Sequence, residues 1–340
     1  MPAQPMVSFC FTTFKRRDYL RSTLDSILGQ TFGDYEVIVS DNDPEQSGRT
    51  VVEGMGDARF KYFPNETNLG MKKSFNKSLD RSSGQYIVMI ADDDPVYPDM
   101  LETLIRLKDE YPGYGMYLGG SNWFCTDPRI ARLYKLNVGT NSFLAEEPVG
   151  KVTAYTAEGF LKSFFSRDIF PSYLWSTAIV RREVLVNQGG VPDYGTAFLG
   201  DYAYLSIMGA HSGCVVINKA LGHQTIHLQN FGRDQNDQIR TAAVNFTEYV
   251  AGKIRQTPDW PVIEKKMHDF VALWVVSHLS FLHSYYRIFP NEEAMDLRPV
   301  ERQVFTVPFI KKYHFKYWLK IHSPGLHQLI VTVKKQLVKK

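Results

Sequence analysis

The chain has 340 residues, 44% of them hydrophobic, and a net charge of only +3, which is enough for one large α/β domain with additions or for two domains. Its three cysteines, Cys10, Cys125 and Cys214, are widely spaced, which excludes a disulfide framework and a CxxC motif and indicates a reducing compartment. The chain does not open like a signal peptide, and its most apolar stretch, 270–282, is too short to span a bilayer, so we expect a cytoplasmic protein.

Strand-like and helix-like segments alternate through the first 111 residues. Short apolar runs predict strands, and apolar residues at helical spacing predict helices. The predicted strands are 7–11, 35–40, 60–63 and 86–91, and the predicted helices are 18–30, 72–81 and 98–111. This alternation predicts an α/β fold with a mostly parallel sheet flanked by helices.

Polar segments follow three of the predicted strands: 12–16, 41–43 and 92–94. In sheets of this class, ligands bind beyond the carboxyl ends of the strands. The last segment consists of Asp92, Asp93 and Asp94, which we call the aspartate triplet. Carboxylates this close repel one another, so a bound cation is the interpretation we favour. The alternative is a polar turn leading into the helix near Pro98.

Two common nucleotide-binding motifs are absent from the sequence. No GxGxxG opens the first predicted helix, and no GxxxxGK[ST] occurs. Both absences argue against a dinucleotide-binding fold and against P-loop chemistry.

Five segments together resemble the family 2 glycosyltransferases, which have the GT-A fold. They are 7–16, 35–42, 68–70, the aspartate triplet as a DxD motif, and 181–190. The resemblance extends over about residues 5–235. It implies a nucleotide-sugar donor, with a UDP-sugar favoured, and Mn²⁺ or Mg²⁺ as cofactor.

The resemblance also implies roles for the polar residues at the strand ends. Asp94 would be a metal ligand, and Asp92 would contact the ribose or support the metal, with Asp93 in the same nucleotide-sugar site. Thr13 and Asp41 would form the nucleobase pocket. Lys72 or Arg16 would face phosphate, although a solvated surface charge is an equal alternative for both.

The family places its general base at an acidic pair before an aromatic-rich helix. Here the match is Asp201, preceded by Gly200 where the family usually has an acid. A carboxylate at that position removes the proton of the acceptor hydroxyl during attack. The alternative is an N-cap, because Asp201 opens a predicted helix.

Two further candidates come from the second half of the resemblance. The segment 220–230 resembles an H-x-x-N stretch in which His227 is a metal ligand, with His223 as the rival. Trp175 is a candidate platform for the acceptor sugar, and core packing is the favoured alternative.

We expect residues 1–240 to form the glycosyltransferase domain, with a nucleotide-binding half at 1–120 and an acceptor half at 121–240. Residues 241–340 are predicted to be helical, with helices at 241–255 and 262–286. Residues 301–340 carry a net charge of +8, whereas 1–300 carry −5. The basic, aromatic-rich segment 308–340 suits an anionic membrane surface, the alternative being a solvated helix face. No motif indicates nucleic acid as a partner.

The sequence therefore predicts a metal-dependent glycosyltransferase acting on a glycan or lipid-linked glycan. A peripheral location at the cytoplasmic face of the inner membrane is compatible with this prediction. One base and no evident nucleophile favour inversion, and retention stays open. The alternatives are a nucleotidyltransferase, which would have a glycine-rich opening loop where 12–17 has none, and a non-catalytic module that binds a glycan or another partner.

Overall fold

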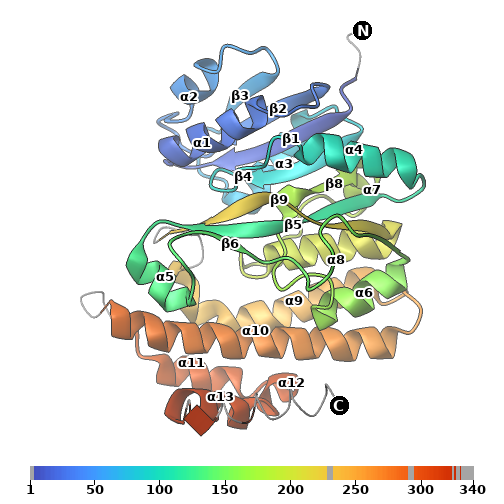
Figure 1. The fold of residues 1–340 in the computed structure, drawn as a ribbon. Helices are drawn as coiled ribbons and strands as arrows, with labels where there is room; N and C mark the ends of the chain where they lie inside the picture. Colours follow the sequence, from blue (N-terminus) through green and yellow to red (C-terminus); the bar gives the residue numbers. More distant parts are fainter. Residues whose placement is uncertain (1–3, 228–232, 290–294, 324, 327–329, 331–340) are drawn as a thin grey trace.

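A nine-stranded sheet runs through the centre of the described chain (Figure 1). The computed structural model describes residues 4–227, 233–289, 295–323, 325–326 and 330. The strand order is β3-β2-β1-β4-β8-β5-β9-β7, with β6 paired to β5. The strands are β1 Val7–Thr13, β2 Tyr35–Asp41, β3 Phe60–Pro64, β4 Tyr86–Ala91, β5 Met116–Cys125, β6 Gly139–Ser142, β7 Val152–Tyr155, β8 Ala178–Arg181 and β9 Cys214–Ile226.

The first four strands form a parallel half-sheet that positions the polar segments. β1 pairs in parallel with β2 and β4, and β2 pairs in parallel with β3. In this register Thr13 lies opposite Asp41, and Thr12 lies opposite Ala91, the last residue of β4. The segments after β1, β2 and β4 therefore meet at one edge of the sheet. β8 joins β4 and β5 in antiparallel pairing, and β5 and β9 are parallel.

Helices cover both faces of the sheet. Successive residues of a strand point to opposite faces, so each strand contributes apolar side chains to both. Phe9 and Phe11 pack in one apolar cluster with α1 and α4, whereas Cys10 packs in another with α3, α6 and α8. The helices are α1 Arg17–Leu28, α2 Arg49–Glu53, α3 Met71–Arg81, α4 Met100–Glu110, α5 Pro128–Tyr134, α6 Ala157–Ser166, α7 Arg182–Asn187, α8 Gly200–Ser212, α9 Ile239–Ile254, α10 Trp260–Ile288, α11 Leu297–Val304, α12 Pro308–Lys311 and α13 His314–His322, with 3-10 turns at Trp175–Thr177 and Arg233–Gln238.

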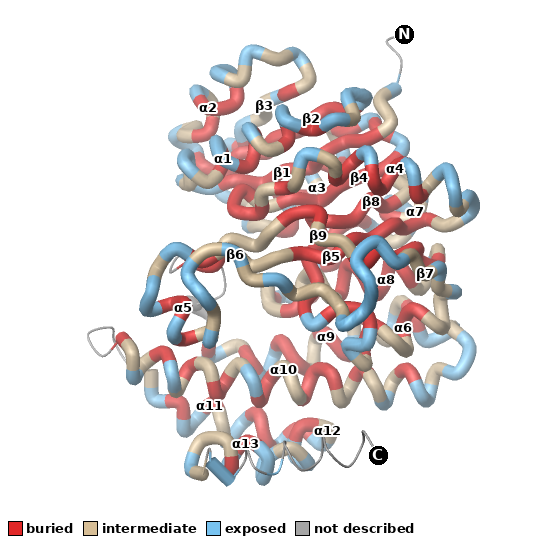
Figure 2. Tube along the Cα trace, viewed as in Figure 1, coloured by how far each residue is buried: buried red, intermediate tan, exposed pale blue. Residues whose placement is uncertain are grey.

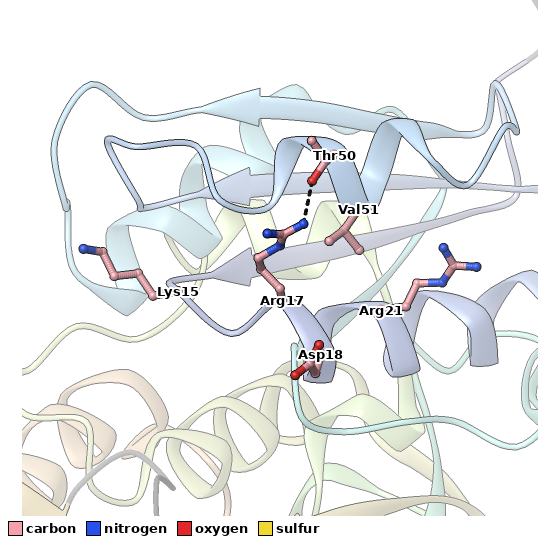
Figure 3. Close-up of a pocket in the computed structure, with 6 residues that line it drawn as sticks. All are labelled: Lys15, Arg17, Asp18, Arg21, Thr50 and Val51. Atoms are coloured by element: carbon pink, nitrogen blue, oxygen red, sulfur yellow. Dashed lines mark hydrogen bonds between the residues drawn. The ribbon is translucent and has the colours of Figure 1, made fainter.

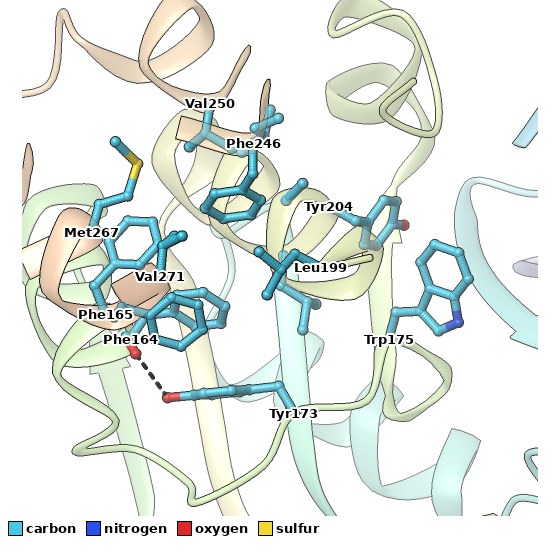
Figure 4. Close-up of a cluster of buried hydrophobic side chains, with 14 of the residues drawn as sticks. Phe164, Phe165, Tyr173, Trp175, Leu199, Tyr204, Phe246, Val250, Met267 and Val271 are labelled. Carbon is cyan, nitrogen blue, oxygen red and sulfur yellow. Dashed lines mark hydrogen bonds between the residues drawn. The ribbon is translucent and has the colours of Figure 1, made fainter. Parts of the chain in front are cut away.

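The C-terminal helices share an apolar core with the second half of the sheet domain. The long helix α10 lies beneath α8 and α9, and its buried residues alternate with exposed ones along its length (Figures 1 and 2). Phe164 from α6, Phe246 from α9 and Val271 from α10 meet in one buried cluster (Figure 4). The domain boundary at residue 240 stays a prediction.

Most predicted elements agree with the structure to within two residues. The helix expected at 98–111 begins at Met100, so Pro98 precedes the helix and Asp99 is the residue before its first turn. The helices expected at 241–255 and 262–286 are α9 and α10. Among the described residues, no helix combines the length and apolar composition needed to cross a bilayer.

Candidate active site

The aspartate triplet lies directly after β4, and all three residues are buried. The hydroxyl of Thr13, at the end of β1, donates to Asp92 Oδ2 at 2.8 Å. Arg16 Nη1 donates to Asp92 Oδ1 at 3.2 Å and to Asp93 Oδ2 at 3.0 Å. Burial and the neighbouring Asp93 raise the pKa of Asp92, whereas Arg16 and Thr13 lower it. Arg16 thus lies against carboxylates and is not a solvated surface charge.

His227, immediately after β9, joins the same cluster. Its Nε2 lies 3.1 Å from Asp93 Oδ2, and its ring stacks on Tyr19 with centroids 4.4 Å apart. The backbone N–H of Thr225 donates to the Asp93 carbonyl at 3.3 Å, which holds the end of β9 beside the triplet. The rival His223 lies elsewhere, with its ring near Tyr97 and Phe124.

Asp94 is buried, and Asp201 is half-buried beside it. Ser176 Oγ donates to Asp94 Oδ2 at 3.1 Å. Burial first, and then the charges of Asp93 and Asp201, raise the pKa of Asp94 well above its ordinary value. Burial also raises the pKa of Asp201 to about 7. Asp201 therefore acts electrostatically on Asp94, although the sequence separates the two by more than one hundred residues.

Asp201 lies in the first turn of α8 but does not cap it. The residue before the helix is Leu199, and no side chain caps its end, so the N-cap alternative is wrong. The backbone N–H of Trp175 instead donates to Asp201 Oδ2 at 3.5 Å. The polar-turn alternative for the triplet explains only its backbone, since a turn alone does not require three buried carboxylates.

Asp41 organises the loop that follows β2. Its Oδ2 accepts hydrogen bonds from Gly48 N at 2.9 Å and Tyr62 Oη at 2.8 Å, and its Oδ1 accepts from Asp43 N at 2.9 Å. A Cβ at Gly48 would lie 2.9 Å from Asp41 Oδ2, so this approach favours glycine. Each carboxylate oxygen has two acceptor positions, which leaves one on Oδ1. Asp41 is fully buried here, and its predicted contact with a nucleobase is untested.

Lys72 and Trp175 are both more buried than a solvated or sugar-facing residue would be. Lys72 Nζ donates to the carbonyl of Thr196, lies 3.6 Å from Asp193 and sits 4.0 Å from the ring centre of Tyr194. Lys72 therefore connects α3 to the segment before α8 and is not a solvated charge.

Trp175 is only 3% exposed and packs edge-on against Phe75 and Tyr204, as Figure 4 shows for Tyr204. Its ring has no free face for a sugar in this structure, which favours the packing alternative for this residue.

An open depression of about 560 Å³ lies on the outer side of the first turn of α1 (Figure 3). Its lining shares no residue with the carboxylate cluster and consists of Lys15, Arg17, Asp18, Arg21, Thr50 and Val51. Arg17 Nη2 donates to Thr50 Oγ1 at 3.1 Å across it. We therefore assign the candidate active site to the carboxylate cluster and not to this depression.

Sequence reasoning did not single out two residues that contact the cluster. Tyr19 lies in the first turn of the helix predicted at 18–30, shortly after the polar segment 12–16, so its position near the strand end was readable from the sequence. Ser176 lies 82 residues from Asp94, and no local pattern connects the two.

The chemistry of the cluster fits a divalent cation, although its ligands are not arranged around one point. Carboxylate oxygens and an imidazole suit Mn²⁺. The pKa of Asp94 is raised first by burial and then by neighbouring carboxylates, whose charge a cation would neutralise. In the part of the chain that the structure describes, no three acidic, histidine or cysteine side chains form a ready metal site. One physical reason is that Arg16 and His227 both contact Asp93 Oδ2.

The fold and this cluster of strand-end carboxylates define an α/β transferase of the GT-A class. Comparison with known sequences agrees: the model of "Glycosyl transferase family 2" matches residues 8–185, more than half of the chain. The chain belongs to family 2 of the glycosyltransferases, which confirms the resemblance seen in its motifs.

Similar proteins include the GalNAc(5)-diNAcBac-PP-undecaprenol beta-1,3-glucosyltransferase of Campylobacter jejuni, 34% identical over 118 residues. That match spans 34% of this chain and 38% of the relative, so only about a third of each is aligned.

Two solved structures have the same fold at low sequence identity. S. aureus TarS with UDP-GlcNAc has a TM-score of 0.60 at 15% identity, covering 92% of this chain and 89% of that one. The mannosyltransferase PcManGT of Pyrobaculum calidifontis with GDP-Man and Mn²⁺ has a TM-score of 0.51 at 16% identity, covering 94% and 87%. These likenesses confirm the GT-A fold.

Proposed function

We propose that this chain transfers a sugar from a nucleotide-sugar donor to a hydroxyl of a glycan acceptor, with inversion and with a divalent cation. The observation that carries the proposal is that Asp201 lies beside the buried aspartate triplet: the neighbouring residues Trp175 and Ser176 donate to Asp201 Oδ2 and to Asp94 Oδ2, and the charge of Asp201 raises the pKa of Asp94. A metal-binding motif and a base are the two parts that such a transfer needs side by side.

The reaction is a single displacement. The acceptor oxygen forms a bond to the anomeric carbon, the bond from that carbon to the phosphate oxygen breaks, and the nucleoside diphosphate leaves with the electron pair. Asp201 takes the proton of the acceptor hydroxyl, and the Trp175 N–H orients its carboxylate. Asp94, with His227, would hold the cation, which supplies charge neutralisation to the leaving diphosphate. Arg16 and Thr13 hold Asp92 in place.

For the donor we propose a UDP-sugar. TarS binds UDP-GlcNAc and PcManGT binds GDP-Man, so both bases occur on this fold. Thr13 and Asp41 lie at the ends of neighbouring strands, where we propose the nucleobase binds. A uracil N–H would use the remaining acceptor position of Asp41 Oδ1 after a small movement of its loop.

For the acceptor we propose a glycan or a lipid-linked glycan. The name of the Campylobacter relative contains a glycan on undecaprenyl diphosphate, which supports an acceptor of that kind here. Such an acceptor would place the protein at the cytoplasmic face of the inner membrane.

Calorimetry tests the proposed function directly. UDP, dTDP, GDP and CMP are titrated into the full chain with and without Mn²⁺. We expect one nucleotide, UDP first, to bind only when Mn²⁺ is present. If folded protein binds none of them in either condition, the transferase proposal fails and a non-catalytic module becomes the better interpretation.

We also propose that α13 docks on an anionic bilayer. Phe315 and Trp318 are 70% and 46% exposed on one helix, and their rings stack 6.3 Å apart with the exposed Lys316 between them in sequence. Exposed aromatics with lysines are typical of interfacial helices. Of the predicted segment 308–340, residues 324, 327–329 and 331–340 lie outside the described part of the chain.

Replacing both aromatics tests this docking. F315S/W318S is expected to reduce sedimentation with vesicles of phosphatidylglycerol roughly tenfold. The reason is that inserting two exposed aromatic rings into the bilayer interface contributes well over 1 kcal/mol to binding. Val149→Ser removes an apolar side chain that is 75% exposed elsewhere and serves as the control. Equal sedimentation of both variants and the wild type would show that α13 is an ordinary solvated helix.

A further inference from the structure

A row of aromatic rings leads away from the segment before Asp201. Phe198 lies three residues before Asp201, and its ring centre is 5.4 Å from that of Trp274 and 5.1 Å from that of His278 on α10. Trp274 and His278 are themselves stacked at 5.1 Å. The row continues along α10 and across to α5 and β5. We call these residues the aromatic row: Phe198, Trp274, His278, Phe281, Tyr134 and Trp123.

The second part of the row reaches the edge of the acceptor half. His278 lies 6.2 Å from Phe281, which lies 4.9 Å from Tyr134 on α5, and Tyr134 lies 5.6 Å from Trp123 on β5. α5 packs beside the C-terminal part of α10 (Figure 1). The row therefore connects α10, α5 and β5, and its first member, Phe198, lies three residues before the proposed base in the sequence.

All six members of the row are half-buried, which distinguishes them from the core aromatics of the same helix. Phe270 and Tyr285 on α10 are 1% and 6% exposed and pack fully inside. Trp274 and Phe281 pack against the same core but keep part of their surface exposed. Each ring of the row keeps part of its surface exposed, and a row of partly exposed aromatic rings is a surface that a ligand can cover.

The polar groups of the row suit a neutral ligand with hydroxyl groups. Trp123 Nε1 and the buried Ser121 Oγ, two residues apart on β5, have no hydrogen-bond partner among the described residues. Buried polar atoms nearly always have a partner, so these two call for one. His278 contacts Asn236 Oδ1 at 3.2 Å, and burial lowers its pKa to about 4, so its ring is neutral. The row carries no charge.

We propose that the aromatic row is the binding subsite for the acceptor glycan, an inference that rests on the proposed function. Pyranose rings have apolar C–H faces that pack on flat aromatic rings, and their hydroxyls supply partners for indole N–H and serine hydroxyl groups. A polyprenyl chain would leave both polar atoms without partners. Tyr194 Oη donates to the Phe198 carbonyl at 2.6 Å, which fixes the row where it meets the segment of Asp201.

The position of the row explains why a glycan would be extended at one end. A glycan lying on α10 would bring its terminal sugar to Phe198, in the segment that leads into Asp201, while the rest of the glycan lies toward α5 and β5. The row spans several ring positions, so we expect oligosaccharides to bind more tightly than monosaccharides of the same sugar.

The test uses the full chain and two matched pairs of variants. Trp274→Leu and Phe281→Leu keep apolar volume but remove a flat ring, and their controls are Trp260→Leu at the other end of α10 and Phe32→Leu before β2. Both controls are half-buried aromatics outside the row. Binding is measured on an array of neutral oligosaccharides of hexoses and N-acetylhexosamines, and UDP binding with Mn²⁺ is measured in parallel.

We expect the wild type to retain at least one oligosaccharide, each row variant to weaken its binding roughly tenfold, and both controls to bind normally. UDP binding should be unchanged in all four variants. Unchanged glycan binding in the row variants, or no retained glycan by protein that still binds UDP, overturns the subsite alone. Binding of undecaprenyl phosphate in detergent micelles that the row variants lose, with no glycan retained, would assign the row to lipid. If the wild type itself did not bind UDP, that result would instead argue against the proposed function.

Discussion

Asp201→Asn is expected to reduce sugar transfer by roughly 10²–10⁴-fold while leaving donor binding unchanged. The amide keeps the size of the side chain and still accepts a hydrogen bond from the Trp175 N–H, but it cannot take the proton of the acceptor hydroxyl. Release of nucleoside diphosphate, with a membrane lipid extract as acceptor source, measures the transfer rate. Calorimetry with the donor nucleotide and Mn²⁺ measures the binding.

Asp168→Asn is the matched control, because Asp168 is an exposed aspartate of the same half of the protein. It should transfer at the wild-type rate. If Asp201→Asn kept more than a tenth of the activity, Asp201 would not be the base. If the variant also lost donor binding, its carboxylate would have a role in the donor site, close to the Asp94 whose pKa it raises.

The parallel half of the fold was readable from the sequence because its signals are local. Each predicted strand is a short apolar run, and each helix has apolar residues at helical spacing, so their ends were correct to within a few residues. The remainder depends on pairing that no local pattern encodes. β8 inserts between β4 and β5 in antiparallel pairing, although the chain passes through β5, β6 and β7 before it reaches β8.

The candidate site was predictable where its residues end strands and unpredictable where they arrive from elsewhere. The parallel register brings Thr13 and Asp41 together, and β4 delivers the aspartate triplet to the same edge. His227 reaches Asp93 only because β9 ends there, and the family motif rather than the fold indicated it. The contact of Ser176 with Asp94 crosses 82 residues and depends on tertiary packing alone.

Burial decides what the type of residue leaves open. Trp175 was a candidate sugar platform with core packing as the favoured alternative, and it fills the core. On α10, Phe270 is buried, whereas Trp274 and Phe281 pack against the core and stay partly exposed. The helical period places both kinds of aromatic residue on α10 equally well. Only the packing of α5, α8 and α9 around that helix determines which of its rings are covered.

Asp94→Asn is expected to stabilise the metal-free protein at pH 8 and to abolish its stabilisation by Mn²⁺. Asp92, Asp94 and Asp201 all have raised pKa values in the folded protein. The folded state therefore binds more protons than the unfolded state, and the free energy of unfolding falls as the pH rises from about 4 to above 7. The pKa of Asp201 is about 7 in the folded protein, so above pH 7 its ionised carboxyl lowers the free energy of unfolding by on the order of 4 kcal/mol.

A cation held by these carboxylates would reverse that loss, because it binds their ionised forms. We therefore expect Mn²⁺ to raise the melting temperature of the wild type more at pH 8 than at pH 5. At pH 8, the free energy of unfolding of Asp94→Asn should exceed that of the metal-free wild type by at least ~1 kcal/mol, which raises the melting temperature by roughly 2 °C. Mn²⁺ should not change the melting temperature of this variant. Asp80→Asn, an exposed aspartate on α3, should behave as wild type in both respects. A Mn²⁺ response that survives in Asp94→Asn would mean that the cation binds without Asp94, and the burial of this carboxyl would then need another explanation.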